Sequence, residues 1–324
     1  MRRREVIFAL AGAAAWPLTA RAQQAGRVYR IGVLETTPAN LNAANIEALT
    51  HSLQALGYIE GQNLVIEYRS ADGRAERFSE LVKDLLRLKV DVIVTRGTPA
   101  VLAAMSATTL VPIVMAAMGE PLMVVSSLAH PGANITGLSA YTNDLEAKRF
   151  ELLKETVRRA KRIAGLYNMG NPVVPPQWRE LERAANVMGV QCDLLDVRKS
   201  EDIEPAFTVA SREHVDGLLV GIDALTQANR KLIADLALQH RIPTMYPSKE
   251  FVETGGLMAY GPSYPDLYRR VAFYIDKILK GERPGELPIE QASKFELAIN
   301  LKTAAMLGLD IPPRMLALAD EVIE

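Results

Sequence analysis

The segment that decides the fold is His130-Pro131-Gly132-Ala133-Asn134-Ile135-Thr136-Gly137-Leu138-Ser139-Ala140-Tyr141-Thr142-Asn143-Asp144, in the middle of a 324-residue chain. It interrupts a long alternation of strand-like and helix-like runs. Its Pro-Gly pair punctuates the chain. We expect Ile135–Leu138 to form a strand leading out of one α/β lobe, and Asp144 to cap the helix that opens a second lobe. A crossing between two lobes predicts a cleft in which a ligand binds.

The composition is typical of a globular protein with a full hydrophobic core. Hydrophobic residues make up 49% of the chain and charged residues 23%, and the formal net charge is −1. A chain of this length usually forms two domains. So small a net charge gives no indication of nucleic acid or an acidic membrane surface as a partner.

The N-terminus has the pattern of a secretory signal. Arg2, Arg3 and Arg4 precede the apolar run Val6–Trp16, and Ala20-Arg21-Ala22 fits a small-x-small cleavage site, so we expect residues 1–22 to be a signal peptide. The apolar run is shorter than the roughly 20 residues of a membrane span. Consecutive arginines favour the twin-arginine route. Sec export is the alternative, because Val6 stands where a twin-arginine signal has Phe.

The sole cysteine, Cys192, allows no internal disulfide, and no cysteine stands at the cleavage point to accept a lipid. These features predict an exported, unlipidated protein of a Gram-negative periplasm.

Apolar runs alternate with amphipathic runs along the whole chain. The strand-like runs are residues 29–34, 64–68, 90–94, 111–115, 162–167, 190–197, 215–222, 242–246, 255–260 and 295–301, and the tail from 303 to 323 is predicted to be mostly helical. Regular βα alternation predicts parallel sheets with helices on both faces. We therefore predict an α/β protein of two doubly wound parallel-sheet lobes. The first comprises residues 27–140 with about 264–288, and the second comprises 141–263 with about 289–324.

Polar or small residues follow many of these strands, at the carboxyl ends where parallel sheets bind ligands. The candidates are Thr36, Thr37, Gly97, Thr98 and Ala117 in the first lobe, and Asn168, Asn171, Asp223, Tyr246 and Ser248 in the second. Thr98 opens a helix with Pro99 at its first position, and the free N–H groups of a helix N-terminus form an anion site.

Several candidates have a purely structural alternative. Thr98 could serve only as an N-cap, and Asp223 could cap the helix that follows it. Asn171 before Pro172 is typical of a turn. Tyr246 could pack at the rim of the cleft.

Familiar catalytic motifs are absent from the sequence. No Gly-x-Gly-x-x-Gly follows the first strand, and there is neither a P-loop nor a Gly-x-Ser-x-Gly elbow. The four histidines, His51, His130, His214 and His240, have no metal-ligand spacing. We therefore expect a binding protein without a metal or cofactor, not an enzyme.

Some runs are distinctive enough to indicate a family. They are Leu56–Tyr68, Leu88–Val94, Pro131–Gly137, Glu250–Met258, Asn300–Ala304 and Ile311–Pro313. With these runs the chain resembles ABC transporter substrate-binding proteins, of the broad family that includes tryptophan- and tyrosine-binding members. The resemblance covers essentially the whole chain, signal included. It implies a type I periplasmic-binding fold with three crossings between lobes, a small-molecule ligand, a permease and an ATPase in the inner membrane as partners, and a monomer.

One segment departs from the family pattern. Where the family has Gly-Asp-Pro and a run of small residues, this chain has Gly119-Glu120-Pro121-Leu122-Met123, about two residues shorter. Such a loop faces the cleft in this fold, so the identity of the ligand does not carry over from the resemblance.

The predicted function is the solute-binding component of an ABC import system, which closes around a small molecule; we favour an amino-acid-like or aromatic carboxylate. Ligand binding would shift the population toward the closed form. For an amino acid, we expect the helix N-terminus at Thr98 to receive the carboxylate, Asp223 to pair with the ammonium, and Tyr246 to pack against the body. An exported sensor acting on a signalling partner is the alternative. An exported enzyme on the same fold is a third class.

Overall fold

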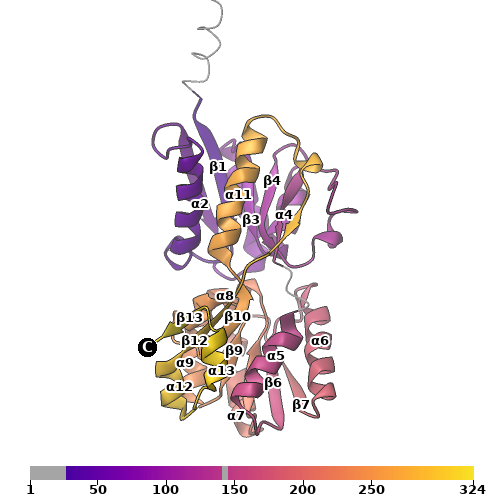
Figure 1. Ribbon diagram of the computed structural model, residues 1–324. Helices are drawn as coiled ribbons and strands as arrows, with labels where there is room; N and C mark the ends of the chain where they lie inside the picture. The colour runs from indigo at the N-terminus through magenta and orange to yellow at the C-terminus, as the bar shows by residue number, and fades with distance from the viewer. Residues whose placement is uncertain (1–26, 141–144) are drawn as a thin grey trace, which may run out of the picture.

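The computed structural model describes residues 27–140 and 145–324, which form two α/β lobes stacked along one long axis (Figure 1). The predicted signal peptide and the predicted cap Asp144 lie outside these described residues. Within the described ranges, no helix combines the length and the apolar character that a membrane crossing requires.

The first lobe is built on a six-stranded sheet in the order β11-β5-β4-β3-β1-β2, with every pairing parallel. Its strands are β1 (Tyr29–Glu35), β2 (Leu64–Ser70), β3 (Val92–Arg96), β4 (Ile113–Met118), β5 (Ile135–Ser139) and β11 (Glu290–Gln291). Its helices are α2 (Ala43–Ala55), α3 (Phe78–Arg87), α4 (Thr98–Ala107) and α11 (Tyr264–Leu279), with the 3-10 turns η1 (Ala39–Leu41), η2 (Ala75–Arg77), η3 (Pro121–Met123) and η5 (Pro284–Glu286).

The periodicity of the sequence accounts for these layers. Strand β3 is buried along its whole length because helices cover both faces of the sheet. Helix α3 buries one apolar stripe, Phe78, Leu81, Val82 and Leu85, in the core it shares with α4. On the other face α2 and α11 pack side by side, although they are far apart in the sequence (Figure 1).

The second lobe is built on a seven-stranded sheet in the order β13-β12-β10-β9-β8-β6-β7. Its strands are β6 (Arg162–Tyr167), β7 (Gln191–Asp196), β8 (Gly217–Val220), β9 (Thr244–Tyr246), β10 (Met258–Pro262), β12 (Phe295–Asn300) and β13 (Glu321–Ile323). Its helices are α5 (Leu145–Thr156), α6 (Val174–Val187), α7 (Ile203–Arg212), α8 (Ala224–Ala228), α9 (Arg230–Gln239), α10 (Lys249–Val252), α12 (Leu301–Leu307) and α13 (Pro313–Leu318), with the 3-10 turn η4 (Ser200–Asp202). The pairing of β10 with β12 is antiparallel, and the others are parallel.

The chain passes between the lobes three times: between β5 and α5, between β10 and α11, and between β11 and β12. The predicted fold class, two mostly parallel-sheet lobes with three crossings, is therefore confirmed. Strand β11 pairs with β5 through Glu290 and Gln291. We accordingly propose that the third crossing begins after Gln291, slightly beyond the predicted boundary near residue 288.

Two local predictions were wrong. The tail is not helical to its end, because after α13 strand β13 pairs with β12. Just before β13, the N–H of Asp320 donates to the carbonyl of Leu297, and the Asp320 carboxylate accepts from the N–H of Leu297. Ala117 is not in a loop. Strand β4 continues to Met118 through a register shift, and Ala117 pairs with Arg96 at the end of β3.

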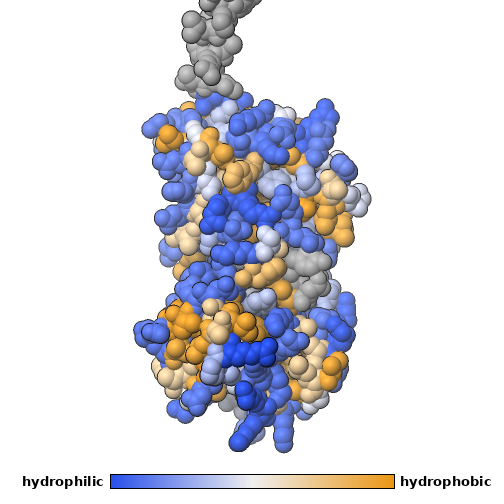
Figure 2. Space-filling model, in the orientation of Figure 1, coloured by the Kyte–Doolittle hydropathy of each residue, from blue (hydrophilic) through white to orange (hydrophobic). Residues whose placement is uncertain are grey.

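The two lobes are in contact. On the face shown in Figure 2, away from the grey atoms, they meet without an open groove between them. Hydrogen bonds join them directly, including one from the Arg230 guanidinium to the carbonyl of Leu41 at 2.6 Å. The structure therefore represents a closed arrangement of the lobes.

Candidate ligand-binding site

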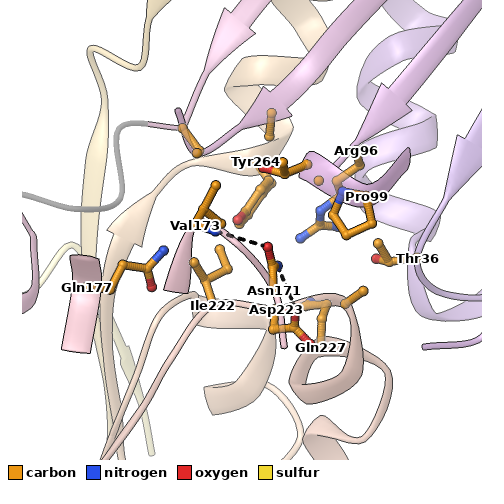
Figure 3. A pocket seen from close by; sticks show the side chains of 16 residues that line it. Thr36, Arg96, Pro99, Asn171, Val173, Gln177, Ile222, Asp223, Gln227 and Tyr264 are labelled. Atoms are coloured by element: carbon orange, nitrogen blue, oxygen red, sulfur yellow. Dashed lines mark hydrogen bonds between the residues drawn. The ribbon is translucent and has the colours of Figure 1, made fainter. Parts of the chain in front are cut away.

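A cavity lies between the lobes, where loops at the carboxyl ends of both sheets face each other (Figure 3). Its empty volume, counted together with the space that opens to solvent, is about 500 Å³. The first lobe contributes Thr36, Arg96, Gly97, Thr98, Pro99, Ala117, Gly119, Ala140 and Tyr264, and the second contributes Asn171, Val173, Gln177, Ile222, Asp223, Ala224 and Gln227.

The amino end of helix α4 forms one wall. Gly97 is the N-cap residue with φ 86°, a conformation that favours glycine, and its N–H donates to the carbonyl of Ala117 at 2.8 Å. Thr98 is thus the first residue of the helix, not its cap as the sequence suggested, and its side chain is buried at the cavity. Pro99 has no N–H to donate. The partial positive charge of this helix end still lies at the cavity wall.

Asp223 forms the opposing wall, in the second lobe. Its carboxylate accepts from the side-chain amides of Asn168 at 2.9 Å and Asn171 at 2.7 Å, and from the N–H of Leu225 at 2.9 Å. It therefore caps helix α8, as the structural alternative predicted, and lines the cavity as well. None of these three donors is a cation, so the negative charge of Asp223 is not neutralised by them.

Arg96 and Tyr264 form a third part of the lining. The Arg96 guanidinium lies 3.8 Å from the centre of the Tyr264 ring and pairs with Glu250 of the second lobe at 2.8 Å. Burial opposes the charge of Arg96, but Glu250, Tyr264 and Glu35 outweigh it and raise the pKa of Arg96 above its ordinary value. Arg96 therefore stays positively charged, and the carboxylate of Glu250 already balances that charge.

Apolar side chains fill much of the remaining lining. Val173 and Ile222 come from the second lobe and Ala140 from the first, and Figure 3 shows Val173 and Ile222 close to Asn171. The amides of Gln177 and Gln227 add polar groups from helices α6 and α8. An apolar space with a few polar groups at defined positions is typical of a small-molecule site.

The structure brings six of the ten predicted residues to this cavity: Thr36, Gly97, Thr98, Ala117, Asn171 and Asp223. Asn168 lines a wider space that adjoins the cavity and shares Asn171 and Asp223 with it. In that space its amide donates to Asp223.

Three predicted residues do not line the cavity. Tyr246 ends the short strand β9 inside the second lobe, where its fully buried ring stacks on Phe251 at 4.9 Å between centres. The backbone carbonyl of Thr37 accepts from the Tyr68 hydroxyl at 2.6 Å within the first lobe. Ser248 precedes helix α10, and its hydroxyl donates to Glu250 at 3.3 Å.

Other lining residues were missed because the prediction considered only the loops after strands. Gln177, Gln227 and Tyr264 lie on helices. Arg96 carried a usable signal, since an arginine at the end of an otherwise apolar strand needs a partner for its charge. Among the described residues, no group of three or more His, Cys, Asp or Glu side chains could hold a metal ion.

Known proteins resemble this chain in sequence and in fold. The family model described as ABC transporter substrate binding protein matches residues 31–323. The tyrosine-binding protein of Clostridioides difficile (strain R20291) is 26% identical over 260 residues, which cover 80% of this chain and 74% of that protein.

Two solved structures are similar over 91% of this chain and 100% of their own. The conserved domain protein from Vibrio cholerae O1 biovar El Tor has 28% sequence identity and a TM-score of 0.84. The ABC domain from Streptococcus pneumonia in complex with L-Trp has 27% identity and a TM-score of 0.83.

Proposed function

Because this chain belongs to the family of ABC transporter substrate-binding proteins, we propose that it captures an amino-acid-like or aromatic carboxylate in the cavity between its lobes. The family match spans residues 31–323, so the resemblance read from the sequence is confirmed, as is the expectation of a binding protein and not an enzyme. The ligand class is our proposal.

The observation that carries this proposal is the opposite character of two cavity walls. Asp223 offers an anionic carboxylate from the second lobe, and the amino end of α4 offers partial positive charge from the first. Apolar side chains line much of the rest. A zwitterion with an apolar body matches all three parts. The relatives support this class, since one is a tyrosine-binding protein and another was solved with L-Trp.

We assign the residues as follows. Asp223 pairs with the ligand ammonium, and the start of α4 at Thr98 receives the carboxylate. Val173 and Ile222 pack against the body of the ligand, in place of the Tyr246 ring predicted from the sequence. Arg96 is not the carboxylate site, because Glu250 already occupies its guanidinium.

Hinge closure is the proposed mechanism. Thr98 and Asp223 belong to different lobes, so a ligand touches both only when the lobes are together. Binding therefore shifts the population toward the closed form. Family membership supports delivery of the ligand to an ABC transporter. We propose that residues 1–22 direct export to the periplasm, and that the closed monomer docks on a permease with its ATPase.

A thermal-shift screen of the purified protein tests the ligand class. L-Tryptophan, L-tyrosine and L-phenylalanine should raise the melting temperature by a few degrees at concentrations near 100 times Kd, since such binding contributes about 2.7 kcal/mol. Indole and phenol, which lack both charged groups, should give no shift at the same concentrations. Shifts with sugars or nucleosides and none with any carboxylate would overturn the proposal.

A further inference from the structure

A group of buried polar side chains joins the two lobes beside the cavity. We call it the interlobe clasp, and it consists of Asn42, Asn45 and Arg96 from the first lobe with Gln227, Arg230 and Glu250 from the second. Only Arg96 and Gln227 also line the cavity. The clasp is therefore largely separate from the residues proposed to hold the ligand.

Glu250 is the centre of the clasp. Its two carboxylate oxygens accept from both terminal nitrogens of Arg96, at 2.8 and 3.3 Å, which is a bidentate ion pair. The amide of Asn45 donates to the same carboxylate at 2.8 Å from the first lobe, and the amide of Gln227 donates to it from the second. Arg96 in turn donates to the side-chain oxygen of Asn42 at 3.2 Å.

The number of donors decides whether this ion pair is favourable. Burying an ion pair removes both charges from water, and the loss is recovered only when further hydrogen bonds satisfy the remaining lone pairs. Glu250 has donors from Arg96, Asn45, Gln227 and Ser248. Burial acts to raise the pKa of Glu250, but Arg96, Arg230 and the amide of Asn45 together lower it below its ordinary value.

Arg230 forms a second link between the lobes. One of its terminal nitrogens donates to the backbone carbonyl of Leu41 at 2.6 Å. The side chain is buried, and it does not line the cavity. Neither this contact nor the pair of Arg96 with Glu250 can exist when the lobes are apart, because the partners belong to different lobes.

We propose that Glu250 is a positioning residue: it holds Arg96 over Tyr264 and stabilises the closed form before any ligand binds. This inference rests on the hinge closure proposed above, but not on the class of ligand. If only a fraction of the free protein is closed, the apparent Kd equals the intrinsic Kd divided by that fraction. Glu250 thus sets the affinity and residence time of the ligand although it does not line the cavity.

The test compares the parent protein with Glu250→Gln, which removes the charge and keeps the shape. Small-angle X-ray scattering of the ligand-free proteins should give a larger radius of gyration for the variant. With L-tryptophan and L-tyrosine as probes, Kd should rise about tenfold, mainly through a faster dissociation rate. Saturating probe should return the variant to the radius of the parent.

Asp276→Asn is the matched control. Asp276 is a buried carboxylate of α11 that accepts from the Tyr58 hydroxyl at 3.0 Å, entirely within the first lobe. This variant should lower the melting temperature while leaving the radius of gyration and the dissociation rate unchanged. Arg230→Gln, which breaks the second link, should also increase the ligand-free radius of gyration and the dissociation rate. If Glu250→Gln does not fold, this variant tests the clasp in its place.

The results distinguish a failure of the clasp proposal from a failure of the proposed ligand class. Equal ligand-free radii and equal dissociation rates in the parent, Glu250→Gln and Arg230→Gln would overturn the clasp. A larger radius in both variants, with no carboxylate of the thermal-shift screen bound by the parent, would support the clasp and overturn the proposed ligand class.

Discussion

Two buried arginine–glutamate pairs differ in what surrounds them. Arg149 and Glu146 lie on one helix, α5, 2.6 Å apart and fully buried inside the second lobe. Arg96 and Glu250 lie 154 positions apart and meet between the lobes. The first pair is formed whenever the second lobe is folded, whereas the second pair also requires the lobes to be together.

The carboxylates of these two pairs also differ in the direction in which their pKa is shifted. Burial raises the pKa of Glu146 above its ordinary value despite Arg149 and the Tyr167 hydroxyl, which donates to it at 2.7 Å. The pKa of Glu250 is lowered. The comparison teaches that a buried ion pair contributes to whichever process buries it: folding in one case and closure in the other.

The largest expected effect is on the pair within the lobe. Glu146→Ala leaves the Arg149 guanidinium buried without its anion, although it still donates to the carbonyls of Tyr260 and Pro247. We expect a loss of about 3–5 kcal/mol in the free energy of unfolding, measured by urea denaturation. A loss no larger than that of Glu250→Gln would contradict the distinction between the two pairs.

The next effect concerns a third buried carboxylate, that of Glu35, which interacts with Arg96. Glu35 is fully buried, and burial raises its pKa to about 7 despite the opposing effect of Arg96. The unfolded chain releases this proton near pH 4.5, so the native state binds more protons between pH 4.5 and 7. The free energy of unfolding should therefore fall as the pH rises through this window, by on the order of 3 kcal/mol.

Glu35→Gln should remove that contribution. The measurement is urea unfolding of the variant and the parent at pH 5 and pH 8. The stability of the variant relative to the parent should be greater at pH 8. A difference between the two proteins that did not depend on pH would contradict the role of Glu35.

Asp223 extends the comparison to a buried carboxylate whose donors among the described residues are side-chain amides and backbone N–H groups, not cations. Asp223→Asn removes the negative charge but retains a residue that caps helices equally well. We expect Kd for L-tryptophan to rise about 10- to 100-fold, since a hydrogen bond to a charged group contributes about 1.5–3 kcal/mol. Calorimetric titration checks this, and a cooperative melting transition of the ligand-free variant shows that it remains folded.

The smallest effect is expected at an exposed pair. Arg183 and Glu180 form an ion pair on the surface of α6, where water already solvates both charges. Arg183→Gln should leave the melting temperature, the radius of gyration and the ligand Kd unchanged. A clear change in any of these would show that burial is not what separates the first two pairs from this one.

The sequence by itself determined the local architecture. Alternating apolar runs predicted the two sheets. Gly57 follows α2 with φ 94°, and a glycine in this conformation is typical of a helix end, which a sequence can signal locally. Six of the ten predicted site residues reach the cavity, because residues after parallel strands gather at one edge of each sheet. These features follow from periodicity and turn chemistry over a few residues.

Only the tertiary structure decided which side chains face one another. Glu250 stands in a recognisable run of sequence, but nothing near it indicates a partner 154 positions away. Tyr246 is the last residue of β9 and not the first residue of the loop after it, so its ring lies in the core and not at the cavity. Periodicity assigns a residue to an element and a face. The meeting of two lobes depends instead on the packing of distant segments, which no local pattern encodes.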